Sequence, residues 1–440
     1  MKKMMIGGLA LALTATVAAG CGNKDNGTKN ASSPSPSAGA SASASATPKK
    51  NVTIKMFQFK VEIAEQLNKL IAEYEKQTGV KIQVETVGGG ADYGAALKTK
   101  FNSNDKPDIF NNGGYSDLDL WVDQLEDLSD QPWVKDLVKG AAEPMTKNGK
   151  LYGQPLNLEG YGFIYNKDLF AQAGITELPK TLTQLEAAAK KLQDKGITAF
   201  ENGYGEWWVL GNHFVNLPFA QQPDPNAFID GLNKGTAKIS GNAAFDNWVK
   251  LFDLTLKYGN KNPLQTDYHT QVTDFATGKA AMMQQGNWTQ VQISKTNPNI
   301  KIGFLPMPIS DDAATMDKLP VGVPNNWVVN KNSAVKDEAK KFLNWMVTSD
   351  AGKKTITNEF KFIPAFTTIP ADESVLGPLA ADIIKYSKDG KTLTWNWFKF
   401  PVGESSSKKF GDAMQGYVGK KFTKEQMLDD FQKTWDGLKK

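Results

Sequence analysis

Residues 52–84, VTIKMFQFKVEIAEQLNKLIAEYEKQTGVKIQV, decide the fold class of this chain. Apolar and polar residues alternate at 52–57 and again at 80–84, which is the pattern of a strand with one buried face. Between the two runs, apolar residues fall on one face of a helix and a glycine stops it: Ile63, Leu67, Leu70, Ile71, Tyr74 and Gly79. The stretch therefore predicts a βαβ unit within a parallel, helix-covered sheet.

Signals of the same α/β type continue along the chain. Residues 107–110 predict a short strand, 182–195 predict a helix with a capping box at its start, and 339–346 predict a later helix. The glycine run at 88–90 lacks the G-x-G-x-x-G and Walker spacings, so it predicts a turn and not a phosphate cradle. The chain as a whole predicts an α/β protein built of repeated strand and helix units.

Length and composition limit the function. Residues 51–440 are too many for one typical core, so two domains are expected. The formal charge of +4 falls to +2 without Lys2 and Lys3, so nothing points to nucleic acid. The sequence contains no Arg and only two His, His213 and His269, but it has 11 Trp, 11 Tyr and 23 Phe. This inventory disfavours a small anionic ligand and zinc chemistry, and it favours a neutral, hydroxylated ligand that stacks on rings.

The N-terminal residues have the features of a bacterial lipoprotein signal. Lys2 and Lys3 precede an apolar run at 4–17 and three small residues, and Cys21, the single cysteine, follows. Residues 1–20 are therefore predicted to be a signal peptide. Residues 21–50 are predicted to be a lipidated cysteine followed by a tether of Ser, Ala and Pro that cannot form a core. This places the protein on the outer face of a cytoplasmic membrane, in the cell-wall or periplasmic space.

Several motifs occur in an order that resembles one protein family. They are PDIF at 107–110, NGKLYGQP at 148–155, YNKDLF at 165–170, AGI at 173–175 with PKT at 179–181, FATGKAAMM at 275–283 and IGFLPMP at 302–308. Together they resemble the extracellular solute-binding proteins of ABC importers, in particular the carbohydrate-binding group that includes the maltodextrin-binding proteins.

The resemblance implies a two-lobe, periplasmic-binding-protein-like α/β fold in which each lobe is a helix-covered, mostly parallel sheet and a hinge joins the lobes. The first lobe would take 51–157 plus 306–360, and the second 158–305 plus 361–440. A sugar or oligosaccharide would lie in the cleft and be delivered to a membrane permease. No cofactor and no metal site are expected, and the protein is expected to be a monomer.

The resemblance also suggests two binding residues. It places Glu159 where the family has a hydroxyl-binding glutamate, although a solvated loop carboxylate is the alternative. It also matches Trp288 to a tryptophan that stacks on sugar, with Asn287 as its polar neighbour, whereas a core tryptophan would need a hidden N–H partner. Tyr161 is a weaker candidate because it could simply pack at the hinge.

Two pairs of tryptophans are further candidates. Trp207 and Trp208 are adjacent, so one is expected to line the cleft and the other to pack. Trp395 and Trp397 are two residues apart, which puts both rings on one side if the segment is extended. Such a pair suits an oligosaccharide, but packing of one ring in the core fits nearly as well.

Polar residues at strand ends complete the set, because ligands of open α/β sheets bind beyond the carboxyl ends of strands. These candidates are Gln58, Asn112, Gly113, Asn325, Asn326 and Trp327. By contrast, three tryptophans among helical repeats are assigned to the core: Trp248, Trp345 and Trp435.

Two other functions remain as alternatives. A secreted glycoside hydrolase would need two carboxylates flanking a sugar, for which Glu159, Asp267 and Asp274 are available. A receptor for a peptide, polyamine or metal would share the fold and the anchor, but it would require acidic clusters or more histidines. Neither alternative has a motif of its own in this sequence.

Replacing Cys21 tests the anchor. Cys21→Ala should release the protein into the medium or leave it as an uncleaved precursor, because both the acylation site and the lipoprotein cleavage site are lost. Fractionation and alkyl labelling would measure this. A processed, alkyl-labelled variant that stays in the membrane fraction would contradict the prediction.

Overall fold

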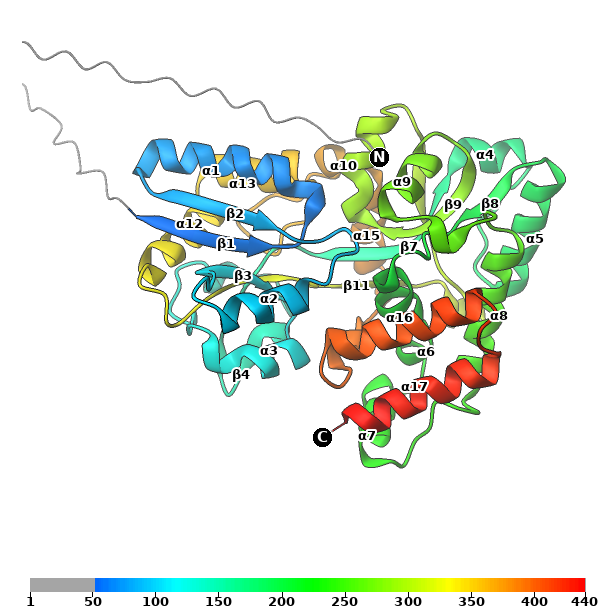
Figure 1. The fold of residues 1–440 in the computed structure, drawn as a ribbon. Helices are drawn as coiled ribbons and strands as arrows, with labels where there is room; N and C mark the ends of the chain where they lie inside the picture. The colour runs from blue at the N-terminus through cyan, green and yellow to red at the C-terminus, as the bar shows by residue number, and fades with distance from the viewer. Residues whose placement is uncertain (1–51, 440) are drawn as a thin grey trace, which may run out of the picture. The chain divides into compact units, whose positions relative to one another are not determined.

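Two hydrophobic cores, each built on its own β-sheet, organise residues 52–439, the part of the chain that the computed structural model describes. We call them the first and second lobe, in chain order (Figure 1). The predicted signal peptide, Cys21 and the predicted tether lie outside the described residues. Within those residues, no helix combines the length and the apolar character needed to cross a bilayer.

The sheet of the first lobe has the strand order β2-β1-β3-β12-β6. Its strands are β1 (Thr53–Gln58), β2 (Lys81–Thr86), β3 (Ile109–Asn112), β6 (Gln154–Pro155) and β12 (Asn326–Val329). The helices of this lobe are α1 (Ala64–Thr78), α2 (Tyr93–Asn102), α3 (Ser116–Trp121), α12 (Lys336–Thr348) and α13 (Asp350–Lys354). A hairpin pairs β4 (Thr146–Lys147) with β5 (Lys150–Leu151). Helices α1 and α13 lie on one side of the sheet, and α2 and α3 lie on the other (Figure 1).

The opening βαβ prediction is confirmed. β1 pairs in parallel with β2, and α1 connects them. The helix buries its predicted apolar face, and Gly79 ends it with φ 74°, a left-handed conformation that costs glycine little.

The sheet of the second lobe has the order β13-β11-β7-β9-β8, and β10 also pairs with β7. Its strands are β7 (Glu159–Asn166), β8 (Thr198–Glu201), β9 (Ala280–Gly286), β10 (Ile302–Leu305), β11 (Leu319–Gly322) and β13 (Thr392–Leu393). All residues of β7 and β9 are buried. These two strands therefore form the centre of the second core.

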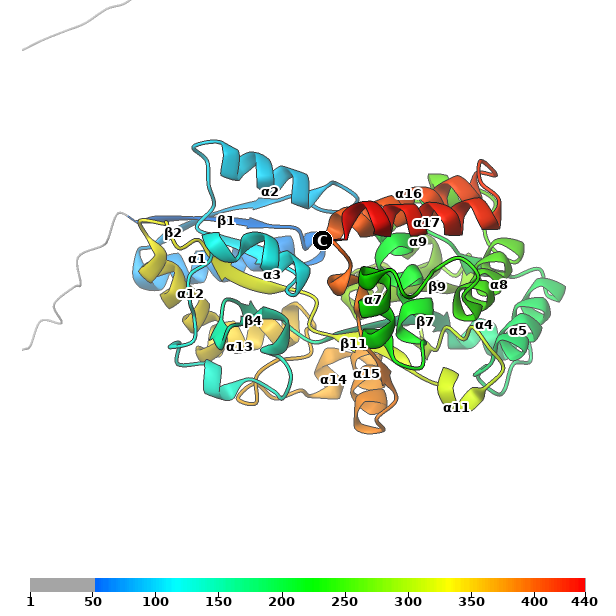
Figure 2. The same ribbon diagram turned by 90° about the horizontal axis from the view of Figure 1, so that it is seen from below.

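Helices surround this second sheet. They are α4 (Lys167–Gln172), α5 (Leu182–Asp194), α6 (Val215–Ala220), α7 (Pro225–Lys234), α8 (Ala243–Lys257), α9 (Tyr268–Ala276), α10 (Gln290–Thr296), α11 (Ala313–Met316), α14 (Glu373–Leu376), α15 (Pro378–Lys388), α16 (Glu404–Val418) and α17 (Lys424–Leu438). Helices α16 and α17 run side by side, on the same side of the molecule as α2 (Figure 2). The start of α16 is thereby brought toward the first lobe.

The sheets are mixed, so the prediction of mostly parallel sheets is wrong in this detail. In the first sheet β12 is antiparallel to both β3 and β6, and in the second sheet β7 is antiparallel to β9, β10 and β11. The reason is connectivity: β12 and β7 enter their sheets directly from the other lobe, and antiparallel pairing needs no helical crossover.

The chain passes between the two cores three times, near 156–161, 319–323 and 369–376. These packing boundaries differ from the predicted ones. Met307, Ile309 and Leu319 are buried in the second core, so 306–322 does not belong to the first lobe. The first core also extends beyond 360, to Ile369. The segment that returns to the first lobe begins only after β11 because β11 pairs with β7.

Candidate ligand-binding site

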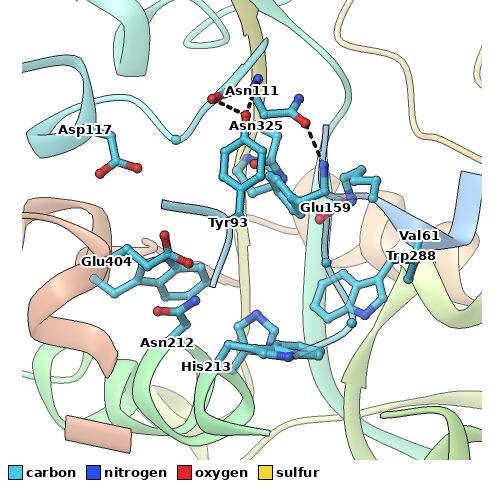
Figure 3. A pocket seen from close by; sticks show the side chains of 18 of the residues that line it. Val61, Tyr93, Asn111, Asp117, Glu159, Asn212, His213, Trp288, Asn325 and Glu404 are labelled. Carbon is cyan, nitrogen blue, oxygen red and sulfur yellow. Dashed lines mark hydrogen bonds and ion pairs between the residues drawn. The ribbon is translucent and has the colours of Figure 1, made fainter. Parts of the chain in front are cut away.

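A cavity of about 210 Å³ lies between the two lobes (Figure 3). The first lobe contributes mainly loops that follow strands and the first turns of helices, including Phe59, Lys60, Glu62, Tyr93, Asn111, Asn112, Asp117 and Asn325. The second lobe contributes most of the aromatic rings, including Trp207, Trp208, Tyr268, Trp288, Trp395, Trp397 and Phe398, together with Asn212, His213 and Glu404. The cavity therefore has a ring-rich wall on one lobe and a polar wall on the other.

His213 lies at the centre of the aromatic wall. It belongs to a π-helical turn, Val209–Phe214, and five aromatic rings surround its own, four of them within 5.3 Å. The ring centroids of Tyr161, Trp288, Trp397 and Trp208 lie 4.6, 5.0, 5.2 and 5.3 Å from that of His213. Rings packed this closely support one another, so the wall is built before any ligand arrives.

The imidazole of His213 is neutral at physiological pH. Burial, aided by the positive charge of Lys60, lowers its pKa to about 3. Its Nδ1 atom has no hydrogen-bond partner among the described residues, although only 5% of the residue is exposed. His213 thus offers an uncharged, unpaired polar atom in the wall of the cavity.

A buried ion cluster connects the two lobes. The Nζ atom of Lys60, two residues beyond β1, lies 2.5 Å from Glu159 at the start of β7 and 2.9 Å from Glu62. Asn157 donates a further hydrogen bond to the same Glu159 oxygen. Burial alone would lower the pKa of Lys60, but the two carboxylates outweigh it and hold that pKa above its usual value. Lys60 is therefore charged, and its charge is already paired.

Two further carboxyl groups lie at the other side of the cavity, Asp117 from α3 and Glu404 from α16 (Figure 3). Burial raises the pKa of Asp117 to about 6. Burial, followed by the nearby charge of Asp117, raises the pKa of Glu404 to about 8. Among the described residues, neither group forms an ion pair with a lysine or histidine.

Several buried polar atoms around the cavity have no hydrogen-bond partner. They are Asn111 Nδ2, Trp207 Nε1, Asn212 Oδ1, His213 Nδ1, Tyr268 Oη and Trp395 Nε1. A buried polar group without a partner costs roughly 1–3 kcal/mol, so native structures rarely leave so many in one place. These atoms are suited to a ligand rich in hydroxyl groups.

The glycine loop at 88–90 is a turn, and it also lines the cavity. Gly90 has φ 95°, and a Cβ atom there would lie 2.6 Å from Oε2 of Glu206 on the second lobe. Glu206 is itself held by Trp208 Nε1 and by the backbone N–H of Tyr268. A side chain at position 90 would therefore hold the two lobes apart.

Eight of the predicted site residues line the cavity: Asn112, Gly113, Glu159, Trp207, Trp208, Trp288, Trp395 and Trp397. Asn325 lines it as well. The expectation that only one of Trp207 and Trp208 would do so is wrong, because both lie at the start of a helical segment where successive side chains are only about 100° apart. The Trp395 and Trp397 rings do form a platform, with centroids 4.6 Å apart.

The other five predicted residues do not line the cavity. The side chain of Gln58 bonds to Lys60 and Thr86, so it braces the end of β1. The Tyr161 hydroxyl donates to His213 O, behind the ring wall.

Asn287, Asn326 and Trp327 are also buried away from the cavity. Asn287 accepts a hydrogen bond from the backbone of Gly160, and Asn326 donates one to Asn112 O. Trp327 lies in the core of the first lobe, because β12 has a strand on either side and packs on both faces.

Sequence reasoning missed several lining residues that come from helix starts. Tyr93, Asp117 and Glu404 lie in the first turns of α2, α3 and α16. The available signal was general: ligand sites gather where helices begin beyond strand ends. His213 and Lys60 had no local signal.

The remaining expectations have mixed outcomes. Trp248 and Trp435 are fully buried in the second core, and Trp345 packs, half-buried, against the first core. Asp267 caps α9 and Asp274 pairs with Lys279, so neither joins Glu159 in the cavity. Within residues 52–439, no three His, Cys, Asp or Glu side chains gather as a metal ion would require.

Two α/β lobes with a ring-walled cavity between them define a two-lobe ligand-binding protein. The chain belongs to the family of bacterial extracellular solute-binding proteins, whose model matches residues 60–353.

Relatives of known name are similar over most of the chain. It is 27% identical over 312 residues to the multiple sugar-binding protein of Streptococcus mutans, covering 69% of this chain and 73% of that one. It is 24% identical over 338 residues to the melibiose/raffinose/stachyose-binding protein MelE of Bacillus subtilis, covering 74% and 76%.

Solved structures share the fold. The solute-binding protein RafE in complex with raffinose superposes with a TM-score of 0.74 at 24% identity, covering 88% of this chain and all of that one. A sugar transporter protein of Bacillus licheniformis in complex with stachyose gives a TM-score of 0.75 at 22% identity, with 88% and 100% covered. The two-lobe α/β prediction is confirmed.

Removing the Lys60 charge tests the ion cluster. Lys60→Met should lower the free energy of unfolding at pH 7 by about 3–5 kcal/mol, because it strands two buried carboxylates. Urea unfolding at pH 7 measures the loss.

Lys69→Met is the matched control, because Lys69 pairs with Glu65 on the exposed face of α1. It should leave the free energy of unfolding nearly unchanged. Equal losses in the two variants would show that the Lys60 cluster contributes nothing special.

Proposed function

We propose that this protein captures a sugar or oligosaccharide in the cavity between its lobes and delivers it to an ABC permease in the membrane. The observation that carries the proposal is the ring-rich wall around His213, with unpaired polar atoms beside it. The C–H faces of sugars stack on rings, and their hydroxyl groups need placed donors and acceptors. The cavity combines both kinds of surface.

The relatives support the same reading. Two relatives match this chain over about three quarters of their own length. One is named as a multiple sugar-binding protein, and the other as a melibiose/raffinose/stachyose-binding protein. Binding without conversion fits the family, whose name describes solute binding. We propose no catalytic role for the carboxyl groups of the cavity.

The proposal includes the cellular location of the protein. A lipid on Cys21 would hold the protein at the outer face of the cytoplasmic membrane, and residues 22–50 would give it reach. The two lobes would act as a monomer that closes over the sugar by a hinge motion. The permease would recognise the closed form.

Calorimetry with a panel of mono- and oligosaccharides tests the function. At least one saccharide should bind with a single site, and chromatography of the same sample after incubation should recover it unchanged. A saccharide that is consumed would indicate a hydrolase, and heat only from peptides, polyamines or metal ions would indicate another receptor class.

Trp288 is the residue on which we expect binding to depend most. Its Nε1 atom already donates to Gln285 Oε1, and its ring lies over Gly286, so what remains for the ligand is the ring face. Trp288→Ala should weaken binding of the best saccharide in the panel by about 2–4 kcal/mol, as truncations of buried aromatic contacts do. Titration calorimetry measures the change.

Trp248→Ala is the matched control, since Trp248 is fully buried and does not line the cavity. It should lower stability by about 3–5 kcal/mol while the folded fraction binds normally. If Trp288→Ala binds normally, or behaves like Trp248→Ala, the assignment of its ring to the ligand is wrong.

A further inference from the structure

The charges that line the cavity are not evenly compensated. Lys60 is the only cationic side chain among the lining residues, and it contacts both Glu62 and Glu159. Asp117 and Glu404 remain, and the cation that acts on both, Lys98, is exposed and forms no ion pair with either. No free positive charge is therefore left in this wall for a ligand.

The two carboxyl groups come from different lobes, and each is influenced by a backbone N–H group of the other lobe. The backbone N–H of Glu404, the first residue of α16, lowers the pKa of Asp117. The backbone N–H of Gly94, in the first turn of α2, lowers the pKa of Glu404. A helix start is the usual place for an anion to bind, and here both starts are already occupied by the protein's own carboxyl groups.

Close packing fixes these positions. A Cβ atom on Gly94 would lie 2.7 Å from Oε2 of Glu404, and one on Gly113 would lie 2.9 Å from Oδ2 of Asp117. Gly403, with φ 56°, likewise leaves no room beside Asp117. The backbone thus approaches both carboxyl groups closely, and a side chain at any of these glycines would displace them.

The atoms that await a ligand are uncharged. Three of them are N–H groups of Asn111, Trp207 and Trp395, each on a residue at least nine-tenths buried and without a partner. Uncharged donors suit the oxygens of a neutral saccharide. They give a carboxylate or sulfate no counter-charge for the hydration it loses.

We propose that Asp117 and Glu404 are specificity-determining residues that make the cavity accept neutral saccharides and reject acidic ones. The proposal rests on the function proposed above and adds the charge class of the ligand. At pH 7 the pair holds about one proton, so a uronate, sulfate or phosphate would bring a further negative charge beside one that is already half-buried.

The pair also couples binding to protons. In this structure burial raises the pKa values of the two groups to about 6 and about 8, and opening of the lobes would return them toward their ordinary values. The other charged groups that act on the pair are Asp92, which raises the pKa of Glu404, and Lys98, which lowers both. Because the closed form holds more protons between these values and the ordinary ones, affinity for a neutral saccharide should be highest below about pH 4, fall as the pH rises, and level off above about pH 8.

A glycan array tests the proposal. The array carries pairs of glycans. One member of each pair is a neutral α-galactoside, maltodextrin or chitin oligosaccharide, and the other is the same glycan with a uronate or a sulfate group. The wild-type protein should bind the neutral member of its preferred pair at least tenfold more tightly than the acidic one. The double variant D117N/E404Q should reduce this ratio to about threefold or less, and Glu404→Gln alone, used if the double variant does not fold, should reduce it partly.

Asp119→Asn and Asp412→Asn are the matched controls. They remove the same charge from exposed sites outside the cavity, on α3 and α16, and should leave the ratio unchanged. Glu404→Gln should also flatten the pH dependence of neutral-glycan binding, which a merely structural role would not change.

Each outcome decides the question. Equal binding of neutral and acidic glycans by the wild-type protein, an unchanged ratio in the variants, or an unchanged pH profile would overturn the charge selection while leaving sugar capture intact. Binding to no glycan at all would overturn the proposed function together with it.

Discussion

The buried contact of Lys60 with Glu159 is the constraint on which the site depends. Lys60 follows the first strand of one lobe, and Glu159 begins the central strand of the other. A buried charge that loses its partner is costly, so each lobe requires the other to be near. The contact also lies where the chain crosses between the two cores. There the backbone N–H of Leu158 donates a hydrogen bond to the carbonyl oxygen of Ile363. The ion pair thus holds the two lobes together at the side of the cavity where the chain crosses between them.

The same ion cluster governs the electrostatics of the wall. The charge of Lys60 disfavours a second cation nearby, and with burial it keeps His213 neutral. Since Lys60 is shared between two carboxylates, it contributes little net attraction for an anion. What the wall presents to a ligand is therefore ring faces and uncharged polar atoms, which is the surface that a sugar matches best.

The sequence predicted the parts of this arrangement that depend on local pattern. The alternation at 52–57, the helical face before Gly79 and the polar end of the 107–110 strand all led to correct elements, and Asn112 followed from the last of these. Trp327 and Tyr161 were predicted to bind the ligand, but they do not line the cavity. Both faces of their strands are buried, and the alternation of apolar and polar residues cannot reveal this. Asp117 lies beside the start of α16, which is far away in the sequence, so no local sequence pattern predicts their proximity.

The second lobe supplies most of the rings and the first lobe supplies most of the polar groups, an arrangement that suits capture of a ligand followed by closure. The rings of the second lobe already pack on one another, so a sugar face can settle on them without reorganising the wall. In the proposed closure the first lobe would add its polar groups when the lobes meet, since its glycine loop and α2 lie within contact of the second lobe in this structure. In the proposed closure Asp117 and Glu404 come together, so the charge of the ligand would have its effect at this step. A ligand that fits the rings but carries an unmatched charge would reach the wall and still fail to close the cleft.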